Sequence, residues 1–236
     1  RRRLFELSRS SWADYNPKLI SEGGGVFSRS LKSVPISKQM RKVLGLDAGV
    51  KSMTPNDLLH AILQAPVDLL WNGGIGTYIK ASVETHADAG DRANNAIRIN
   101  GADVRARIIG EGGNLGMTQR GRIEAALNGV LLNTDFIDNS AGVDTSDHEV
   151  NIKILLGLPV AEGEMTEKQR NALLPEMTDE VAALVLRDNV FQTQVLSVTG
   201  RIAPQMLDAQ SRFMQYLEKA GRLNRAIEYL PSDEQL

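Results

Sequence analysis

The spacing of apolar residues divides the chain into two parts. Up to about Gly157, short apolar runs that fit β-strands alternate with segments in which apolar residues recur at helical spacing. Beyond Gly157 no convincing strand-like run follows. Alternation of strands and helices is typical of a doubly wound parallel sheet. We therefore predict an α/β fold, with a partial Rossmann-like doubly wound parallel sheet in residues 1–157 and a C-terminal helical region, residues 158–236, that packs on it.

The clearest helix start lies at Thr54, because this N-cap residue is followed by Pro55 at the first helical position. The helix should end before Pro66, which cannot continue it. Similar patterns predict further helices at residues 37–44, 118–128 and 145–156. In the helix at 118–128, we expect Ile123, Ala126 and Leu127 to form the apolar side, which in such helices faces the core.

Three short apolar runs, each followed by a loop rich in glycine or asparagine, are predicted to be strands. They are residues 67–71, which we expect to be a buried strand, residues 105–109 and residues 133–137. In open parallel sheets, ligands bind outside the carboxyl ends of the strands. We therefore expect the loops that follow the strands to line a common ligand cleft.

Helix signals continue in the second part of the chain. Thr166 with Gln169, and Thr178, have the pattern of helix starts. Pro204 is predicted to open another helix, because proline favours the first helical turn. We expect the apolar residues of these helices, such as Phe213, to lie in a core.

Composition narrows the class of protein. The 236 residues are 42% hydrophobic and 24% charged, which is typical of soluble globular proteins. Without cysteine the chain has no disulfides, thiolate metal ligands or cysteine nucleophiles, and a cytoplasmic location is our expectation. No apolar run reaches the roughly 20 residues of a membrane span, so we expect no membrane partner.

Charge is distributed unevenly. Residues 1–50 hold ten Lys/Arg and four Asp/Glu, a net +6, while the whole chain has −2. Such a segment could contact phosphates, but few aromatic residues accompany the charges and no base-stacking motif appears. We expect a solvated or partner-docked face, with phosphate contact as the alternative and no nucleic acid partner.

The loop from Gly110 to Gly116 fits the loose glycine pattern GxGxxxG after a predicted strand. The strict dinucleotide pattern fails because Leu115 stands where the third glycine should be. An acidic residue 20–25 positions on, Asp135 or Asp138, is a match that chance also supplies. Three interpretations stay open: a pyrophosphate loop, another ligand-facing loop, and a plain turn. The glycines of residues 72–77 leave the same choice between ligand approach and turn.

Residues 138–149 lead into a predicted helix, whose free N–H groups attract anions. Ser146 and Glu149 also have the spacing of a capping box, and Asn139 suits a turn. Three residues near this helix start could hold a metal ion: Asp144, Asp147 and His148. Neighbouring carboxylates and histidines on a helix are usually only solvated, and we expect no metal site here. The three histidines form no hydrolytic triad with a serine.

Three longer segments together closely resemble the large-type bacterial NAD-specific glutamate dehydrogenases. They are Val67 to Tyr78, Glu111 to Arg122, and Asp138 to Lys153. The resemblance runs from Ser11 to Lys153 and is weaker over the helical tail. It implies that residues 1–157 are the distal part of an NAD-binding domain. It also reassigns the loop at 110–116 to the nicotinamide side of that domain.

The small-subunit glutamate dehydrogenases show a fainter parallel. Their loop of the type EGANGPTT resembles Glu111 to Thr118, and their NAGGVxxS segment resembles Asn139 to Ser146. The resemblance implies that Gly112, Gly113, Asn114 and Asn139 contact NAD, with Asn139 bonded to the carboxamide. It implies that Ser146 holds the side-chain carboxylate of glutamate. This chain departs from the pattern at Leu115, Gly116 and Met117.

The implied reaction is the oxidative deamination of L-glutamate to 2-oxoglutarate and ammonia, with NAD as hydride acceptor. By resemblance, the phosphate-binding loop, the catalytic lysine and aspartate, and the substrate domain belong upstream of residue 1. We therefore expect an inactive piece of a longer polypeptide that pairs with its upstream domains and forms a homo-oligomer. The alternative is a non-catalytic regulatory module that binds a nucleotide or a partner.

Overall fold

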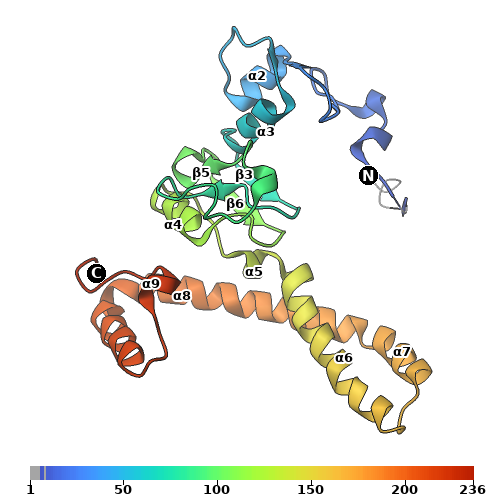
Figure 1. The fold of residues 1–236 in the computed structure, drawn as a ribbon, viewed down its shortest axis with the longest axis vertical. Helices are drawn as coiled ribbons and strands as arrows, with labels where there is room; N and C mark the ends of the chain where they lie inside the picture. Colours follow the sequence, from blue (N-terminus) through green and yellow to red (C-terminus); the bar gives the residue numbers. More distant parts are fainter. Residues whose placement is uncertain (1–5, 8) are drawn as a thin grey trace. The chain divides into compact units, whose positions relative to one another are not determined.

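The computed structural model describes residues 6–7 and 9–236, so part of the basic N-terminal segment lies outside the described residues. The chain divides into two compact units (Figure 1). Unit 1 comprises Arg1–Gly110 and Leu115–Leu132, and unit 2 comprises Glu111–Asn114 and Asn133–Leu236.

The α-helices of unit 1 begin where local signals predict. They are α2 (Lys38–Leu44), α3 (Pro55–Leu63) and α4 (Gln119–Leu127). The N-cap side chains of Ser37, Thr54 and Thr118 each accept a backbone N–H bond from the first helical turn. Gly45 ends α2 in the left-handed conformation, which glycine adopts without steric cost. The three predicted helices of this unit are confirmed.

The strands are shorter than predicted. They are β1 (Val34–Pro35), β2 (Ser52–Met53), β3 (Leu69–Asn72), β4 (Ile79–Lys80), β5 (Ile99–Asn100) and β6 (Ile108–Glu111). Among the described residues they form three two-stranded sheets: β1 with β2 antiparallel, β4 with β5 parallel, and β3 with β6. An α/β class is confirmed, whereas one doubly wound sheet stays a prediction. The apolar run before Asn72 is a strand but not a buried one, since Leu69 and Trp71 are exposed.

Unit 1 has two buried apolar clusters. One centres on Ile79, Ile99 and Met117, and the other on Val34 and Leu58. Short 3₁₀ helices connect the elements: η1 (Trp12–Asp14), η2 (Pro17–Leu19), η3 (Arg92–Asn94) and η4 (Gly101–Asp103). These clusters hold the short strands together, because pairs of two to four residues are too small to be stable alone.

The predicted buried side of α4 is wrong. Ile123 and Leu127 are exposed, and the buried residues of the helix include Gly121 and Ala125. A Cβ on Gly121 would lie 3.0 Å from backbone atoms of Lys80. The helix therefore approaches β4 through its smallest residues, and a pattern based on hydrophobicity alone selects the wrong face.

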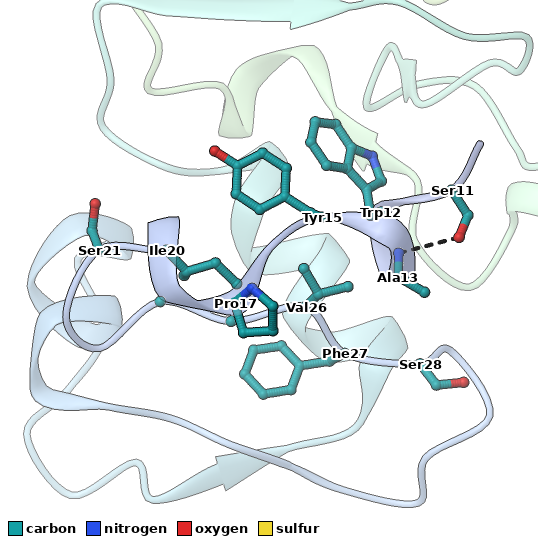
Figure 2. A pocket seen from close by; sticks show the side chains of 12 residues that line it. Ser11, Trp12, Ala13, Tyr15, Pro17, Ile20, Ser21, Val26, Phe27 and Ser28 are labelled. Carbon is teal, nitrogen blue, oxygen red and sulfur yellow. Dashed lines mark hydrogen bonds between the residues drawn. The ribbon is translucent and has the colours of Figure 1, made fainter. Parts of the chain in front are cut away.

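A cavity of about 790 Å³ lies among residues 11–28 of unit 1 (Figure 2). Trp12, Tyr15 and Phe27 contribute rings to its lining, and the Ser11 hydroxyl accepts a bond from the Ala13 N–H. The residues that line the cavity carry no charge. The cavity therefore offers no cation to a phosphate, and phosphate contact by the basic segment stays a prediction.

Unit 2 is helical almost throughout. Its elements are α5 (Asp135–Asp138), a π-helix η5 (Ser140–Asp144), α6 (Thr145–Ala161), α7 (Glu167–Glu176), α8 (Thr178–Lys219) and α9 (Arg225–Glu228). The strand predicted at 133–137 is therefore wrong, and the residues that lead into α6 form the π-helix, with Asn139 in a turn just before it. Leu131 makes a parallel bridge with Ile108 before the helical path begins. Backbone bonds within this path replace those of a strand.

Two predictions about the helical region have opposite outcomes. Thr166 and Gln169 form the predicted capping box at the start of α7. Pro204, however, lies inside α8, which is 42 residues long. A proline inside a helix costs about 3 kcal/mol of stability. The many helical turns on both sides of Pro204 offset this cost.

The apolar side of α8 is largely exposed. Leu186, Val190 and Phe213 are each more than half exposed, and the buried residue of this helix is Val185. The predicted core position of these side chains is therefore wrong for this chain. No helix of the described residues is both long and apolar enough to cross a membrane.

Candidate functional site

The candidate site lies in unit 2, where the loop after β6 meets the path from α5 to α6. Glu111 ends β6 with a fully buried side chain, and Gly112, Gly113 and Asn114 follow it. The Glu111 N–H donates to Oδ2 of Asp138 at 3.0 Å. This bond fixes the start of the glycine loop against α5.

Asp138 is the anchor of this junction. Its second oxygen, Oδ1, accepts a bond from Nδ2 of Asn133 at 3.2 Å. The carboxylate therefore joins the glycine loop to the chain that precedes α5. Sequence reasoning treated Asp138 as a chance match to a ribose-binding acid and missed this role. The available signal was an Asp beside a predicted turn, where its oxygens commonly accept backbone N–H bonds.

The structure brings together two of the predicted NAD-binding residues. Nδ2 of Asn139 donates a short hydrogen bond to Oδ1 of Asn114. Asn114 is exposed and Asn139 is half-buried. Among the described residues, these two side chains make no other hydrogen bond that the structure gives, so N–H donors and an amide oxygen remain available. The geometry thus presents a donor and acceptor pair of the kind that recognises a carboxamide.

Gly142 makes room for the Asn139 side chain. A Cβ on Gly142 would lie 2.5 Å from Oδ1 of Asn139, closer than real contacts allow. The Asn139 carbonyl accepts bonds from the N–H groups of Gly142, at 3.1 Å, and Val143, at 2.9 Å. The π-helical turn of η5 therefore wraps around Asn139, and glycine at position 142 permits this.

Ser146 lies in the first turn of α6 and is half-buried. Its hydroxyl donates to the carbonyl of Val143 at 2.7 Å. The predicted capping box with Glu149 is wrong: the N-cap position is Asp144 in helical conformation, and Glu149 pairs with Lys153 instead. Because η5 runs directly into α6, this helix start has no free turn of N–H groups for an anion.

Ser146 is not joined to the amide pair by any hydrogen bond that the structure gives among the described residues. Asn139 immediately precedes the π-helix η5 and Ser146 lies in α6, so the two residues flank a continuous helical path without a hydrogen bond between them. Asn114, Asn139 and Ser146 all belong to unit 2, and none of the three residues is buried.

Asn189 of α8 holds the start of the π-helix. Its Nδ2 donates to the carbonyl of Ile137 and to the hydroxyl of Ser140, both at 2.7 Å. Ser140 in turn donates to the same Ile137 carbonyl at 3.0 Å. The role of Asn189 was not predicted from the sequence. The feature that could have pointed to it is an amide side chain among the apolar positions of a predicted helix.

The loop at 72–77 belongs to unit 1. Gly76 has φ +139°, and a Cβ there would lie 2.5 Å from Nδ2 of Asn94. The Thr77 N–H donates to the Asp91 carboxylate at 2.8 Å, and the Thr77 hydroxyl donates to the Leu115 carbonyl at 2.7 Å. Hydrogen bonds from Asn94 and Thr77 lower the pKa of Asp91 below its ordinary value. A tight turn explains Gly76, and ligand approach to this loop stays a prediction.

Comparison with known proteins gives a consistent result. The family described as bacterial NAD-glutamate dehydrogenase, catalytic domain, matches residues 1–199. Over the whole chain, NAD-specific glutamate dehydrogenases are 59% identical in Pseudomonas aeruginosa, 57% in Halomonas elongata and 53% in Mycobacterium tuberculosis. The chain spans only 14–15% of the length of these relatives. The chain therefore belongs to the bacterial NAD-glutamate dehydrogenase family, within the region described as its catalytic domain.

Proposed function

We propose that this chain supplies the nicotinamide side of the NAD site in a glutamate dehydrogenase. The reaction is the oxidative deamination of L-glutamate to 2-oxoglutarate and ammonia. The observation that carries the proposal is the hydrogen bond between Asn114 and Asn139, two residues whose roles the family resemblance implies. When bound, NAD accepts the hydride from the substrate Cα.

In this proposal the glycine loop and the amide pair hold the nicotinamide end. Gly112 and Gly113 carry no side chains, so the backbone can approach the cofactor closely. Asn139 bonds the carboxamide, and Asn114 fixes the orientation of Asn139 through their mutual bond. Asp138 keeps both elements together through Glu111. Such positioning groups contribute to rate by restricting the reactants to one geometry.

Ser146 is proposed to bind the side-chain carboxylate of glutamate. A hydroxyl has one proton to donate, and here that proton goes to the Val143 carbonyl. Binding a carboxylate therefore requires the hydroxyl to rotate away from Val143. The carbonyl of Val143 would then lose this side-chain bond, which makes substrate binding by Ser146 modest rather than strong.

The remaining parts of the enzyme are proposed to lie elsewhere in a longer polypeptide. These parts are the phosphate-binding loop, the catalytic lysine and aspartate, and the substrate domain. We propose that residues 1–157 complete a Rossmann-like domain with them, that residues 158–236 form a helical region against it, and that the polypeptide is a cytoplasmic homo-oligomer. The small share of the relatives' length that the chain spans supports this proposal. The chain by itself is expected to be inactive.

The test uses the long polypeptide and two variants. Asn139→Ala should raise the Michaelis constant for NAD by roughly tenfold, as expected for the loss of a hydrogen bond worth about 1.4 kcal/mol. Ser146→Ala should raise the Michaelis constant for glutamate and leave that for NAD near its original value. Asn171→Ala, on exposed α7, is the control and should change neither constant.

Unchanged NAD kinetics in Asn139→Ala would remove the nicotinamide role. An unchanged glutamate constant in Ser146→Ala would remove the substrate role and leave the NAD role standing. Calorimetric binding of a different nucleotide by the polypeptide, with no dehydrogenase activity, would favour a regulatory module instead.

A further inference from the structure

Three side chains of unit 2 meet beside the π-helix and are not used by the proposed function. Asp144 ends η5, His148 lies one turn later in α6, and Asp188 lies in α8. Nε2 of His148 is 3.2 Å from Oδ2 of Asp188 and 3.6 Å from Oδ1 of Asp144. Ligand atoms of the three residues all lie within 4.8 Å of one another. The cluster thus connects α6 and α8 at one point.

The spacing suits a small divalent ion. Zinc binds imidazole nitrogen and carboxylate oxygen at about 2.0–2.2 Å, so two ligands of a tetrahedral site lie roughly 3.3–3.5 Å apart. The two separations from His148 Nε2 fall close to that range. The side chains are 17%, 29% and 32% exposed for Asp144, His148 and Asp188, so an ion could enter from solvent. Small shifts would complete the geometry.

The charges are not balanced within the cluster. Oδ2 of Asp144 is buried and has no hydrogen-bond partner in the described part of the chain. Among the described residues, the cluster also pairs with Arg187, whose Nε lies 3.8 Å from Oδ1 of Asp188. A buried carboxylate oxygen without a donor is costly unless a cation compensates for it.

A protonated histidine compensates for the carboxylates less well than a metal ion. The same atom, Nε2 of His148, faces both Asp144 and Asp188. One N–H can point directly at only one of the two oxygens. A metal ion between the three groups would contact both carboxylates and the nitrogen at the same time.

We propose that Asp144, His148 and Asp188 form a binding site for one divalent transition-metal ion of the zinc class. One imidazole with two carboxylates favours Zn²⁺ or a similar ion over Ca²⁺ or Mg²⁺, which prefer oxygen ligands alone. A water molecule would fill the fourth position. The ion would tie the start of α6 to α8, next to the bonds that Asn189 makes to Ile137 and Ser140.

The site was not expected from the sequence. The local pattern grouped Asp144 and His148 with Asp147, and such helical neighbours are commonly only solvated. In the structure Asp147 is exposed, and the third ligand position belongs to Asp188, which is 40 residues from His148. The contact of α6 with α8 creates the cluster, and a local pattern carries no information on that contact.

The test measures zinc binding by the full chain. After treatment with a chelator and dialysis, the chain is titrated with ZnCl₂ by calorimetry, and Co²⁺ is used as a spectroscopic probe. We expect one Zn²⁺ per chain and the visible absorption of tetrahedral Co²⁺. His148→Ala and Asp188→Asn should each weaken Zn²⁺ binding at least tenfold. His60→Ala in α3 and Asp179→Asn, exposed in α8, are the controls and should bind as the parent chain does.

Circular dichroism without metal checks that the variants fold. Asp188→Asn changes few atoms, so it keeps the test valid if His148→Ala does not fold. Absence of stoichiometric Zn²⁺ binding would overturn the proposal. So would equal Zn²⁺ affinity in the parent chain and in Asp188→Asn, because the ion would then be bound elsewhere. Since these readouts involve neither NAD nor glutamate, failure here leaves the proposed dehydrogenase role untouched.

Discussion

Different interactions stabilise each of the two units of this chain. In unit 1, short strands and helices surround buried apolar clusters around Ile99 and Val34. In unit 2, the path from α5 to α6 is tied to its surroundings by polar side chains, chiefly Asp138 and Asn189, while the apolar side of α8 is exposed. The difference teaches that a helical apolar pattern predicts a helix reliably but does not show what covers it.

The largest expected difference between the units concerns core side chains. Met117→Ala in unit 1 should destabilise the chain by about 2–5 kcal/mol, because the Met117 side chain is fully buried and its loss leaves a cavity. Leu186→Ala in α8 should change stability by no more than about 0.5 kcal/mol, because Leu186 is 67% exposed. Chemical denaturation of the full chain, followed by circular dichroism, measures both. Equal losses would show that α8 is covered in solution.

A pair of glycine substitutions sharpens the same comparison. Gly121→Ala should destabilise unit 1 by about 1–3 kcal/mol, because the new methyl group would press on the backbone of Lys80. Gly157→Ala in α6 should instead stabilise by about 0.4–1 kcal/mol, since no atom lies near the added Cβ and alanine favours the helix. Thermal melts of both variants provide the comparison. A stabilising Gly121→Ala would contradict the close approach of α4 to β4.

The smallest expected difference appears in the pH dependence of stability. Hydrogen bonds from Asn94 and Thr77 lower the pKa of Asp91, so its stabilising effect is full above its unfolded-state pKa and is lost as pH falls through the lower folded-state pKa. Asp91→Asn should therefore lower the melting temperature at pH 7 and have less effect below about pH 4.

Asp233 is the residue of unit 2 that we compare with Asp91, because the pKa of its carboxyl group is also lowered. Bonds from Arg225 and Gln215 lower its pKa, but its side chain is 51% exposed. Asp233→Asn should also lower the melting temperature more at pH 7 than at low pH, by a smaller amount that salt reduces further.

For Asp91→Asn, a loss of melting temperature as large at pH 3 as at pH 7 would show that the carboxylate charge does not stabilise the turn around Thr77.

Local chemistry was predictable from the sequence, and long-range contacts were not. The N-caps Ser37 and Thr54 and the capping box at Thr166 involve residues three positions apart, so their spacing is visible in the chain. The strands were harder, because short runs such as 133–137 fit a strand or a helix equally well. Here backbone bonds within the helical path decided the outcome.

The candidate site shows the same limit. The family resemblance pointed to Asn114 and Asn139, and the structure places their side chains in contact. The residues that support them were missed, since Asp138 contacts a backbone group 27 positions away and Asn189 one 52 positions away. Such contacts depend on how the elements pack. Capping was also expected at Ser146, but the π-helix that precedes α6 removes the free helix start.

The most direct test of the central claim is the position of the nicotinamide ring in the long polypeptide. An electron cryo-microscopy structure with bound NAD should place the carboxamide within hydrogen-bond distance of Asn139, at about 2.7–3.2 Å. Asn114 should remain bonded to Asn139 in that complex. A carboxamide bound by residues outside Gly112 to Ser146, with the amide pair facing solvent, would contradict the account.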